Sequence, residues 1–144
     1  MHVHHILSTK GASVATIVPE ASLADATASL RDHGVGALVV CGDDRRIAGI
    51  VSERDVVRAL ASHGSSTLGR DVASAMSRHV TTCRADDTID SLMELMTERR
   101  IRHLPVVDDD GALAGIISIG DVVKARVGQL ELENEQLTDY IGTR

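Results

Sequence analysis

The stretch Ala48-Gly49-Ile50-Val51-Ser52-Glu53-Arg54-Asp55-Val56-Val57 is a motif that occurs twice in the chain. The second version begins 66 residues later and reads Ala114-Gly115-Ile116-Ile117-Ser118-Ile119-Gly120-Asp121-Val122-Val123. Outward from this motif, residues 14–59 align with residues 80–125 without a gap, and 14 of the 46 aligned pairs are identical. Most other pairs keep their polarity, as Leu30 and Met96 do. The chain is therefore an internal duplication.

Both halves predict the same series of elements. The first helix of each unit begins after Ser22 or Thr88, which are residue types preferred at helix N-caps, and the second begins after Ser52 or Ser118. Turns rich in Gly and Asp separate the second and third apolar runs of each unit, which predicts a β-hairpin. The expected strands are residues 14–18, 37–41 and 47–51 in the first unit and 80–84, 104–107 and 113–117 in the second.

One such unit has too little core to fold comfortably alone, so the two are expected to pack against each other. The predicted fold class is α/β (α+β), with two β-α-β-β-α repeats packed sheet to sheet about a pseudo-twofold axis and extra helices at both ends. The expected boundaries are residues 1–66 for the first repeat with its N-terminal segment, 67–127 for the second with a linker helix, and 128–144 for a C-terminal helical extension.

The segments around the repeats carry weaker signals. Residues 2–8 predict a helix, 63–67 a polar loop and 68–77 a short helix. The last helix continues through Gly128 into an extension that carries Leu130, Leu137, Tyr140 and Ile141. These side chains cover either the chain's own module, the interpretation we favour, or a partner.

Composition excludes several functions. The chain is 43% hydrophobic and has a single aromatic residue other than histidine, so it lacks the rings that a platform for single-stranded nucleic acid needs. A net charge of −6 argues against a nucleic-acid polymer as partner. No apolar run is long enough to span a bilayer, and no leader is evident. Cys41 and Cys83 lie in apolar runs, which indicates buried thiols in a reducing cytoplasm.

The two motifs, together with Arg102-His103-Leu104-Pro105-Val106-Val107-Asp108, resemble a tandem pair of cystathionine-β-synthase (CBS) domains, or Bateman module. The ends of the chain are similar to those of stand-alone bacterial CBS-pair proteins without a fused enzyme. The resemblance implies that adenosine-containing ligands bind in two clefts between the repeats: AMP foremost, or ADP, ATP, S-adenosylmethionine or NAD(H). It also implies a homodimer of modules and control of a partner protein in trans, as an energy or redox sensor.

The Ser-x-x-Asp motif has two interpretations. Such a motif before an apolar run is a capping box, which satisfies the first amides of a helix. The carboxylate can equally accept hydrogen bonds from two ribose hydroxyls while the hydroxyl and helix amides face the ligand. Because the motif occurs twice after Gly-Ile, we favour ribose binding by Ser52 and Asp55 in one site and by Ser118 and Asp121 in the other.

Phosphate requires positive charge, and the repeats supply it unequally. Arg102 and His103 lead into a strand where the family places phosphate-binding side chains, whereas the first repeat has Gly36-Ala37 there. We expect one site to combine Asp55 with Arg102 and His103, and the other to combine Asp121 with Arg54. Lys10 could add a phosphate contact, or it is a solvated loop residue. For Arg99 and Arg100, the helix dipole and solvent are sufficient explanations.

The resemblance places adenine in an apolar slot that packing alone would also explain. The candidate slot residues are Thr16, Ile17, Val18, Gly36, Ala37, Leu38, Thr82, Cys83, Arg84, Leu104 and Pro105.

No catalytic motif occurs, so we expect no enzyme and no catalytic cofactor. His2, His4 and His5 are metal-ligand types, but we expect no metal site at a mobile terminus. The leading hypothesis is a nucleotide sensor, and the alternative is a constitutive interaction or scaffold module with vestigial clefts.

Overall fold

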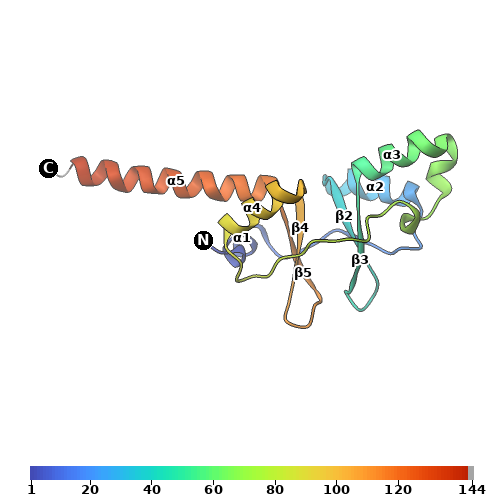
Figure 1. The fold of residues 1–144 in the computed structure, drawn as a ribbon, viewed down its shortest axis with the longest axis horizontal. Coiled ribbons are helices and arrows are strands. Elements are labelled where there is room, and N and C mark those ends of the chain that lie inside the picture. Colours follow the sequence, from blue (N-terminus) through green and yellow to red (C-terminus); the bar gives the residue numbers. More distant parts are fainter. Residues whose placement is uncertain (143–144) are drawn as a thin grey trace.

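The structure, a computed structural model, describes residues 1–142 as two similar units from which a long C-terminal helix extends (Figure 1). Helix α1 (Val3–Lys10) precedes both units, and two short 3-10 turns, Gly64–Gly69 and Val72–Ser74, connect them. The first unit contains β1 (Thr16–Ile17), α2 (Leu23–His33), β2 (Ala37–Cys41), β3 (Ile47–Ser52) and α3 (Glu53–His63). The second contains α4 (Ile89–Arg99), β4 (His103–Val107), β5 (Leu113–Ser118) and α5 (Ile119–Gly142).

The duplication extends to hydrogen-bond register. Both hairpins, β2–β3 and β4–β5, are antiparallel, and the pair Val40–Gly49 in the first recurs as Val106–Gly115 in the second. Each hairpin also has an irregularity directly after that pair. The expected fold class, two related repeats with additional helices, is therefore confirmed.

The first strand of each unit is shorter than expected. β1 pairs in parallel with β2 over two residues, and in the second unit only Cys83 forms a parallel bridge, to Val106. The strand expected at 80–84 is therefore wrong in extent. The chain turns away at Arg84, whose backbone N–H donates to Asp87 Oδ2 at 2.9 Å.

Both predicted caps of the first helices are confirmed. Ser22 Oγ accepts from the backbone N–H of Asp25 at 3.0 Å, and Thr88 Oγ1 accepts from that of Ser91 at 3.1 Å. These bonds satisfy amides that have no partner inside the helix and fix where α2 and α4 begin.

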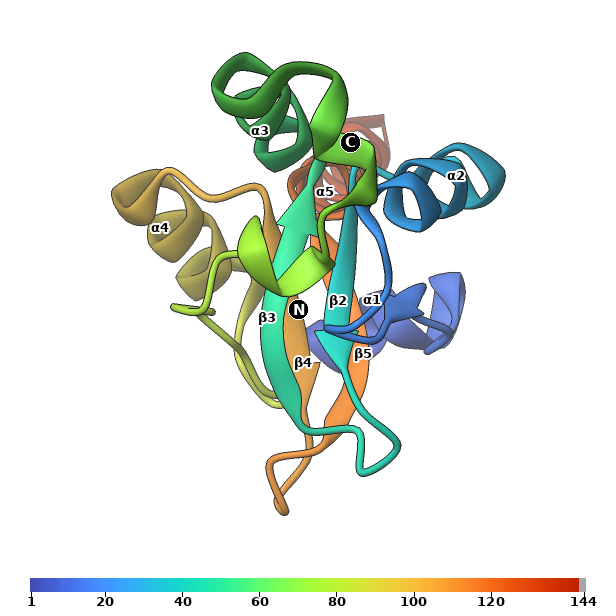
Figure 2. The ribbon, with the colours of Figure 1, turned by 90° about the vertical axis from the view of Figure 1, so that its right-hand side faces the viewer.

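The segments that precede each repeat pack on the opposite unit. Val3 and Ile6 of α1 lie in the core of the second unit, whereas Val72 and Met76 lie in the core of the first. The boundaries expected along the chain therefore differ from the membership of the cores. Between the sheets, Val39 of β2 packs with Leu113 of β5, and Figure 2 shows the first hairpin in front of the second.

Both motifs contain a glycine, Gly49 or Gly115, and its missing side chain leaves room on the sheet for the segment that comes from the other unit. A Cβ added at Gly49 would lie 2.6 Å from the Ser77 carbonyl oxygen and 2.8 Å from Met76 Sδ. A Cβ at Gly115 would lie 2.8 Å from Leu7 Cδ2 of α1. Each glycine thus marks the point where the opposite repeat's leading segment lies directly on the sheet.

Gly49→Ala is expected to lower the free energy of unfolding by about 1–3 kcal/mol, because the new methyl group has no room. The matched control is Gly128→Ala in α5, where a Cβ would meet nothing within 4 Å. Because alanine is the better helix former, the control is expected to be unchanged or more stable by about 0.5–1 kcal/mol. Urea unfolding of both variants measures the difference. Equal stability of the two would contradict this account of the glycine.

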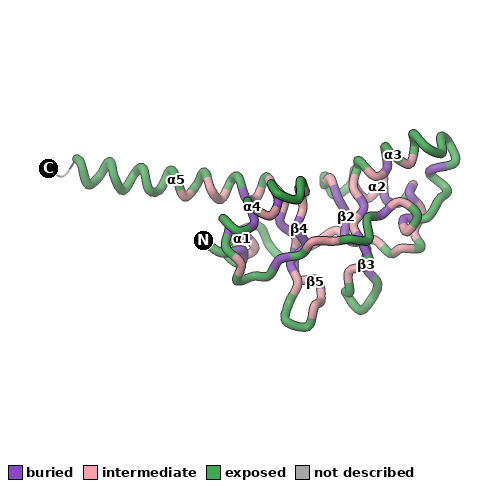
Figure 3. The backbone as a smooth tube through the Cα atoms, in the orientation of Figure 1, coloured by how far each residue is buried: buried purple, intermediate pink, exposed green. Residues whose placement is uncertain are grey.

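Two expectations for the connecting and terminal segments are wrong. Residues 63–67 are not a simple polar loop, because Thr67 is fully buried and its Oγ1 donates to the Ala59 carbonyl at 3.0 Å. The C-terminal extension does not pack on its own module: every residue of α5 from Leu130 onward is exposed (Figure 3). Val122, near the start of α5, is the only buried residue of this helix, so the rest of the helix is not held against the module.

Candidate functional site: a cavity between the two units

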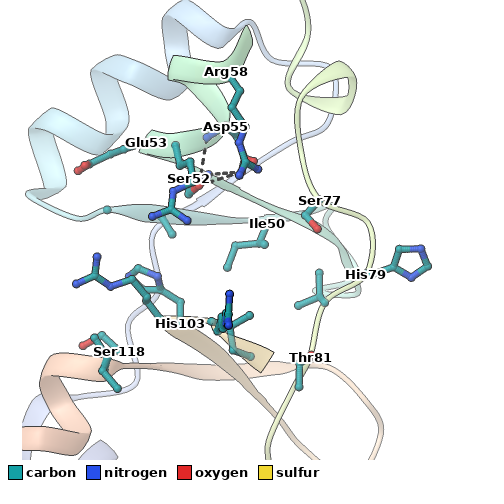
Figure 4. Close-up of a pocket in the computed structure, with 18 residues that line it drawn as sticks. Ile50, Ser52, Glu53, Asp55, Arg58, Ser77, His79, Thr81, His103 and Ser118 are labelled. Atoms are coloured by element: carbon teal, nitrogen blue, oxygen red, sulfur yellow. Dashed lines mark hydrogen bonds between the residues drawn. The ribbon is translucent and has the colours of Figure 1, made fainter. Parts of the chain in front are cut away.

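A cavity of about 520 Å³ lies between the units (Figure 4). The first unit contributes the ends of its hairpin and the beginning of α3, and the second contributes the residues around the beginnings of β4 and α5. The connecting chain at 77–81 supplies a further wall. This volume is in the range of small-molecule sites.

Ser52 and Asp55 form the capping box of α3 at one wall of the cavity. Asp55 Oδ2 accepts from the Ser52 backbone N–H at 2.8 Å and from Ser52 Oγ–H at 3.0 Å. Among residues 1–142, Asp55 Oδ1 has no hydrogen-bond partner, so one carboxylate oxygen remains available beside the cavity. Capping and ligand binding are therefore compatible at this residue.

Arg102 and His103 line the same cavity from the second unit. A Cβ added at Gly36 would lie 3.7 Å from His103 Cε1, so this glycine of the first unit faces the imidazole. Strand pairing fixes the position of His103, which lies opposite Ser118, and the backbone N–H of Ile119 donates to the Arg102 carbonyl at 2.8 Å. The structure thus brings Asp55, Arg102 and His103 together, as the sequence hypothesis requires.

The environment of Asp121 is different. Its Oδ2 accepts from the Ser118 backbone N–H at 2.9 Å and forms an ion pair with Lys10 Nζ at 2.6 Å. Asp121 does not line the cavity, although Ser118 does. Arg54, which we expected to serve the site of Asp121, lines the same cavity as Asp55, on the same helix. Lys10 of the crossing helix α1 is the cation beside Asp121.

Only two of the candidate adenine-slot residues, Gly36 and Ala37, line the cavity. Leu38, Cys83 and Leu104 belong to the cores, because successive side chains of a strand point to opposite faces. Arg84 turns outward to the Asp108 carbonyl and to the Asp109 carboxylate. The remaining candidates that do not line this cavity are Thr16, Ile17, Val18, Thr82 and Pro105.

Comparison with known proteins supplies the family. The family model of the CBS domain matches residues 3–62 and again residues 70–128. The chain belongs to the CBS-domain family. Its two units are a tandem CBS pair, as the motifs at Asp55 and Asp121 indicate.

Solved CBS structures resemble this pair throughout. A CBS-domain containing protein from Agrobacterium tumefaciens is 46% identical with a TM-score of 0.84, over 88% of this chain and 99% of that one. CBSX2, solved in complex with AMP, is 27% identical with a TM-score of 0.73, over 81% and 90% of the two chains. The mitochondrial CBS domain-containing protein CBSX3 of Arabidopsis thaliana is 40% identical, and the match covers 81% of this chain but 58% of that protein.

Sequence reasoning missed two arginines of this CBS pair. Arg58 lines the cavity one helical turn beyond Asp55, a spacing of three residues that places both on one face of α3. Arg100 also lines it, in the left-handed conformation (φ 53°) where the first repeat has Gly34. A non-glycine residue in the left-handed conformation at a helix end is uncommon. The replacement of the first repeat's Gly34 by Arg100 in the second repeat was therefore the feature of the sequence that could have pointed to Arg100. With Arg54 and Arg102, four arginines line the cavity.

Burial lowers the pKa of His103 below its usual value, and the positive charges of Arg102 and Lys10 lower it further, against the opposing effect of Asp121 and Glu53. The unfolded chain therefore binds this proton at a higher pH than the folded one. His103 thus contributes stability that is present above about pH 6.5 and lost as the pH falls from there toward the folded pKa.

His103→Gln is therefore expected to flatten the decline in unfolding free energy between pH 7.5 and pH 5.5. Urea unfolding of the wild-type and variant CBS pairs at several pH values tests this. An identical pH dependence in the two proteins would contradict the assignment.

The other titratable candidates lie away from the cavity. Both cysteines are free and buried, as expected, and burial raises the pKa of the Cys83 thiol to about 12 and also raises that of Cys41. The nitrogens of His2, His4 and His5 lie within 4.8 Å of one another but are exposed, and His5 Nδ1 already accepts from the His2 backbone N–H at 3.1 Å. Within residues 1–142 of this CBS pair, no helix is long and apolar enough to cross a membrane.

Proposed function

We propose that this CBS pair is a non-catalytic regulatory module that binds an adenosine nucleotide, AMP foremost, in the cavity between its repeats. The observation that carries the proposal is the placement of Asp55 from one repeat and Arg102 and His103 from the other around a single cavity of about 520 Å³. An acceptor for a sugar diol and donors for a phosphate are the two polar requirements of a nucleotide. The AMP complex of CBSX2 supports the choice of AMP.

Each group has a distinct part in this proposal. Asp55 Oδ1 accepts from the ribose hydroxyls, and Ser52 holds the carboxylate through Oδ2. Arg102 and His103 donate to the phosphate, with Arg58 and Arg100 adding positive charge at the cavity wall. Main-chain groups at Gly36 and Ala37 lie where they can read the edge of the base.

We propose that the second site, at Ser118 and Asp121, is the weaker one. The ammonium group of Lys10 lies 2.6 Å from Asp121 Oδ2 and already neutralises this carboxylate, and Asp121 does not line the cavity. The expected stoichiometry at moderate nucleotide concentration is therefore one per chain. ATP, NAD(H) and S-adenosylmethionine remain candidates for either site.

Regulation in this proposal follows from the site lying between repeats. A ligand that contacts both repeats stabilises one arrangement of them, by no more than its difference in affinity for the arrangements. A partner protein in the cytoplasm would read that arrangement from a homodimer of modules. The alternative, a scaffold with vestigial clefts, predicts the same fold without ligand-dependent stability.

Thermal unfolding with a panel of ligands separates these functions. AMP, ADP, ATP, NAD(H) or S-adenosylmethionine at about 100 times its Kd adds about 2.7 kcal/mol to the free energy of unfolding, which raises the Tm by several degrees. Inosine monophosphate, which changes only the base, is the control ligand. If no member of the panel shifts the Tm, the sensor proposal fails and the scaffold remains.

A further inference from the structure

We propose that the C-terminal part of α5 forms a parallel two-stranded coiled coil with the same helix of a second copy of this chain. Helix α5 is 24 residues long, and all its described residues from Leu130 onward are exposed. A helical segment of this length without tertiary contacts is marginal in water. Figure 1 shows it extending away from both units, with space along it for another helix.

Five of the seven exposed large apolar residues of α5 follow a heptad repeat, and the other two are Leu132 and Tyr140. Val123, Val127, Leu130, Leu137 and Ile141 are each 47–63% exposed. With Asn134 between them they are spaced by alternating steps of four and three residues, the a and d positions of a coiled coil. Leu130 and Leu137 then occupy d positions.

The residue types at these positions select two parallel strands. β-branched residues at a with leucine at d favour parallel dimers, and here Val127 and Ile141 occupy a positions. Asn134 occupies the central a position, where a single asparagine fixes register and the two-stranded state because it can pair with its own copy. This self-pairing requires parallel, in-register helices.

Charge complementarity supports the same arrangement. In a parallel pair the g position of one helix faces the following e position of the other. These positions hold Arg126 and Glu131, which are of opposite charge. The next such pair, Glu133 and Thr138, has no like-charge repulsion.

The heptad face differs from the face that α5 packs on its own module. Val122 is fully buried, and Ala125 packs against the same core. Their positions on the helix lie more than a quarter turn from the line through Val123, Val127 and Leu130. Both faces can therefore be covered at once, by the module and by a second α5.

Disulfide cross-linking of the full chain tests the proposal. Leu137→Cys places a thiol at a d position, and Leu132→Cys places one at the outer f position of the same helix, where the native leucine is exposed to the same degree (56% against 57%). Under mild oxidation, non-reducing electrophoresis is expected to show most of the Leu137→Cys protein as a covalent dimer. The Leu132→Cys protein and the wild-type chain, whose own cysteines are buried, are expected to remain mainly monomeric.

Two results would overturn the proposal. Absence of the dimer in Leu137→Cys would show that this position does not face its own copy, as in an antiparallel pair or a complex with a different protein. Equal cross-linking at positions 132 and 137 would show random collision rather than a defined face. Because both positions are exposed and distant from the cores, neither variant is expected to impair folding.

Discussion

Asp55→Ala is expected to weaken AMP binding by about 10- to 150-fold, since each charge-assisted hydrogen bond contributes about 1.5–3 kcal/mol. The carboxylate is the acceptor that we propose for the ribose diol, and Oδ1 has no partner among residues 1–142. The substitution also removes the bond from the Ser52 backbone N–H to the carboxylate, which is one half of the capping box of α3. Ser52 Oγ can still accept from the backbone N–H of residue 55, so the expected cost in stability is about 1 kcal/mol or less. Isothermal titration calorimetry measures the change in affinity.

Asp121→Ala is the matched control for this experiment. Asp121 makes the same two backbone bonds with Ser118 at the beginning of α5 that Asp55 makes with Ser52. It lacks the bond from the serine hydroxyl to the carboxylate and has the ion pair with Lys10 in addition. The control therefore removes the equivalent bond to a carboxylate at a residue that does not itself line the cavity. AMP affinity is expected to change less than about twofold in this variant. Comparable losses in both variants would indicate that the two carboxylates act only through folding.

Arg102→Ala is expected to produce the second large loss, again about 10- to 150-fold in AMP affinity, because it removes a cationic donor to the phosphate. The same variant should bind adenosine, which lacks a phosphate, with little change. This comparison of ligands separates phosphate recognition from damage to the site, because the backbone bond from Ile119 to the Arg102 carbonyl is retained.

Arg99→Ala provides the control variant for Arg102. Arg99 lies in the last turn of α4 and does not line the cavity. It therefore carries the same charge close by without the proposed contact. An equal loss of AMP affinity in both variants would assign the effect of Arg102 to long-range charge alone.

Duplication and turn chemistry determine most of the fold. The 66-residue shift predicts both hairpins, and their register repeats with the same offset. Ser22 and Thr88 predict the starts of α2 and α4 because a hydroxyl at this position satisfies a backbone amide. These signals depend on residues close together in the sequence, so one sequence is enough to recognise them.

The segment before each repeat packs on the opposite unit, and the sequence could not predict this because it depends on long-range packing. Val3 and Ile6 show that α1 has an apolar face but not which core it covers. The same limitation hid the ion pair between Lys10 and Asp121, which lie 111 residues apart in sequence. The sequence shows that Gly49 and Gly115 are identical residues at equivalent positions of the two repeats. Only the structure shows which atoms lie against them.

Part of the candidate site was also beyond sequence reasoning. All five residues of β2 are buried, since one face meets the helices and the other meets the second sheet. The strand therefore has no alternating polarity from which to assign Leu38 to the core rather than to the cavity. Asp55, Arg102 and His103 could be grouped in advance because the pseudo-twofold relation brings the strand start of one repeat toward the helix start of the other.

A crystal structure of the chain grown with AMP tests the central claim most directly. We predict density for one AMP in the cavity between the repeats, with its ribose hydroxyls at Asp55 Oδ1 and its phosphate at Arg102 and His103. An AMP bound instead at Asp121 with Lys10 displaced, or an empty cavity at saturating AMP, would contradict the account.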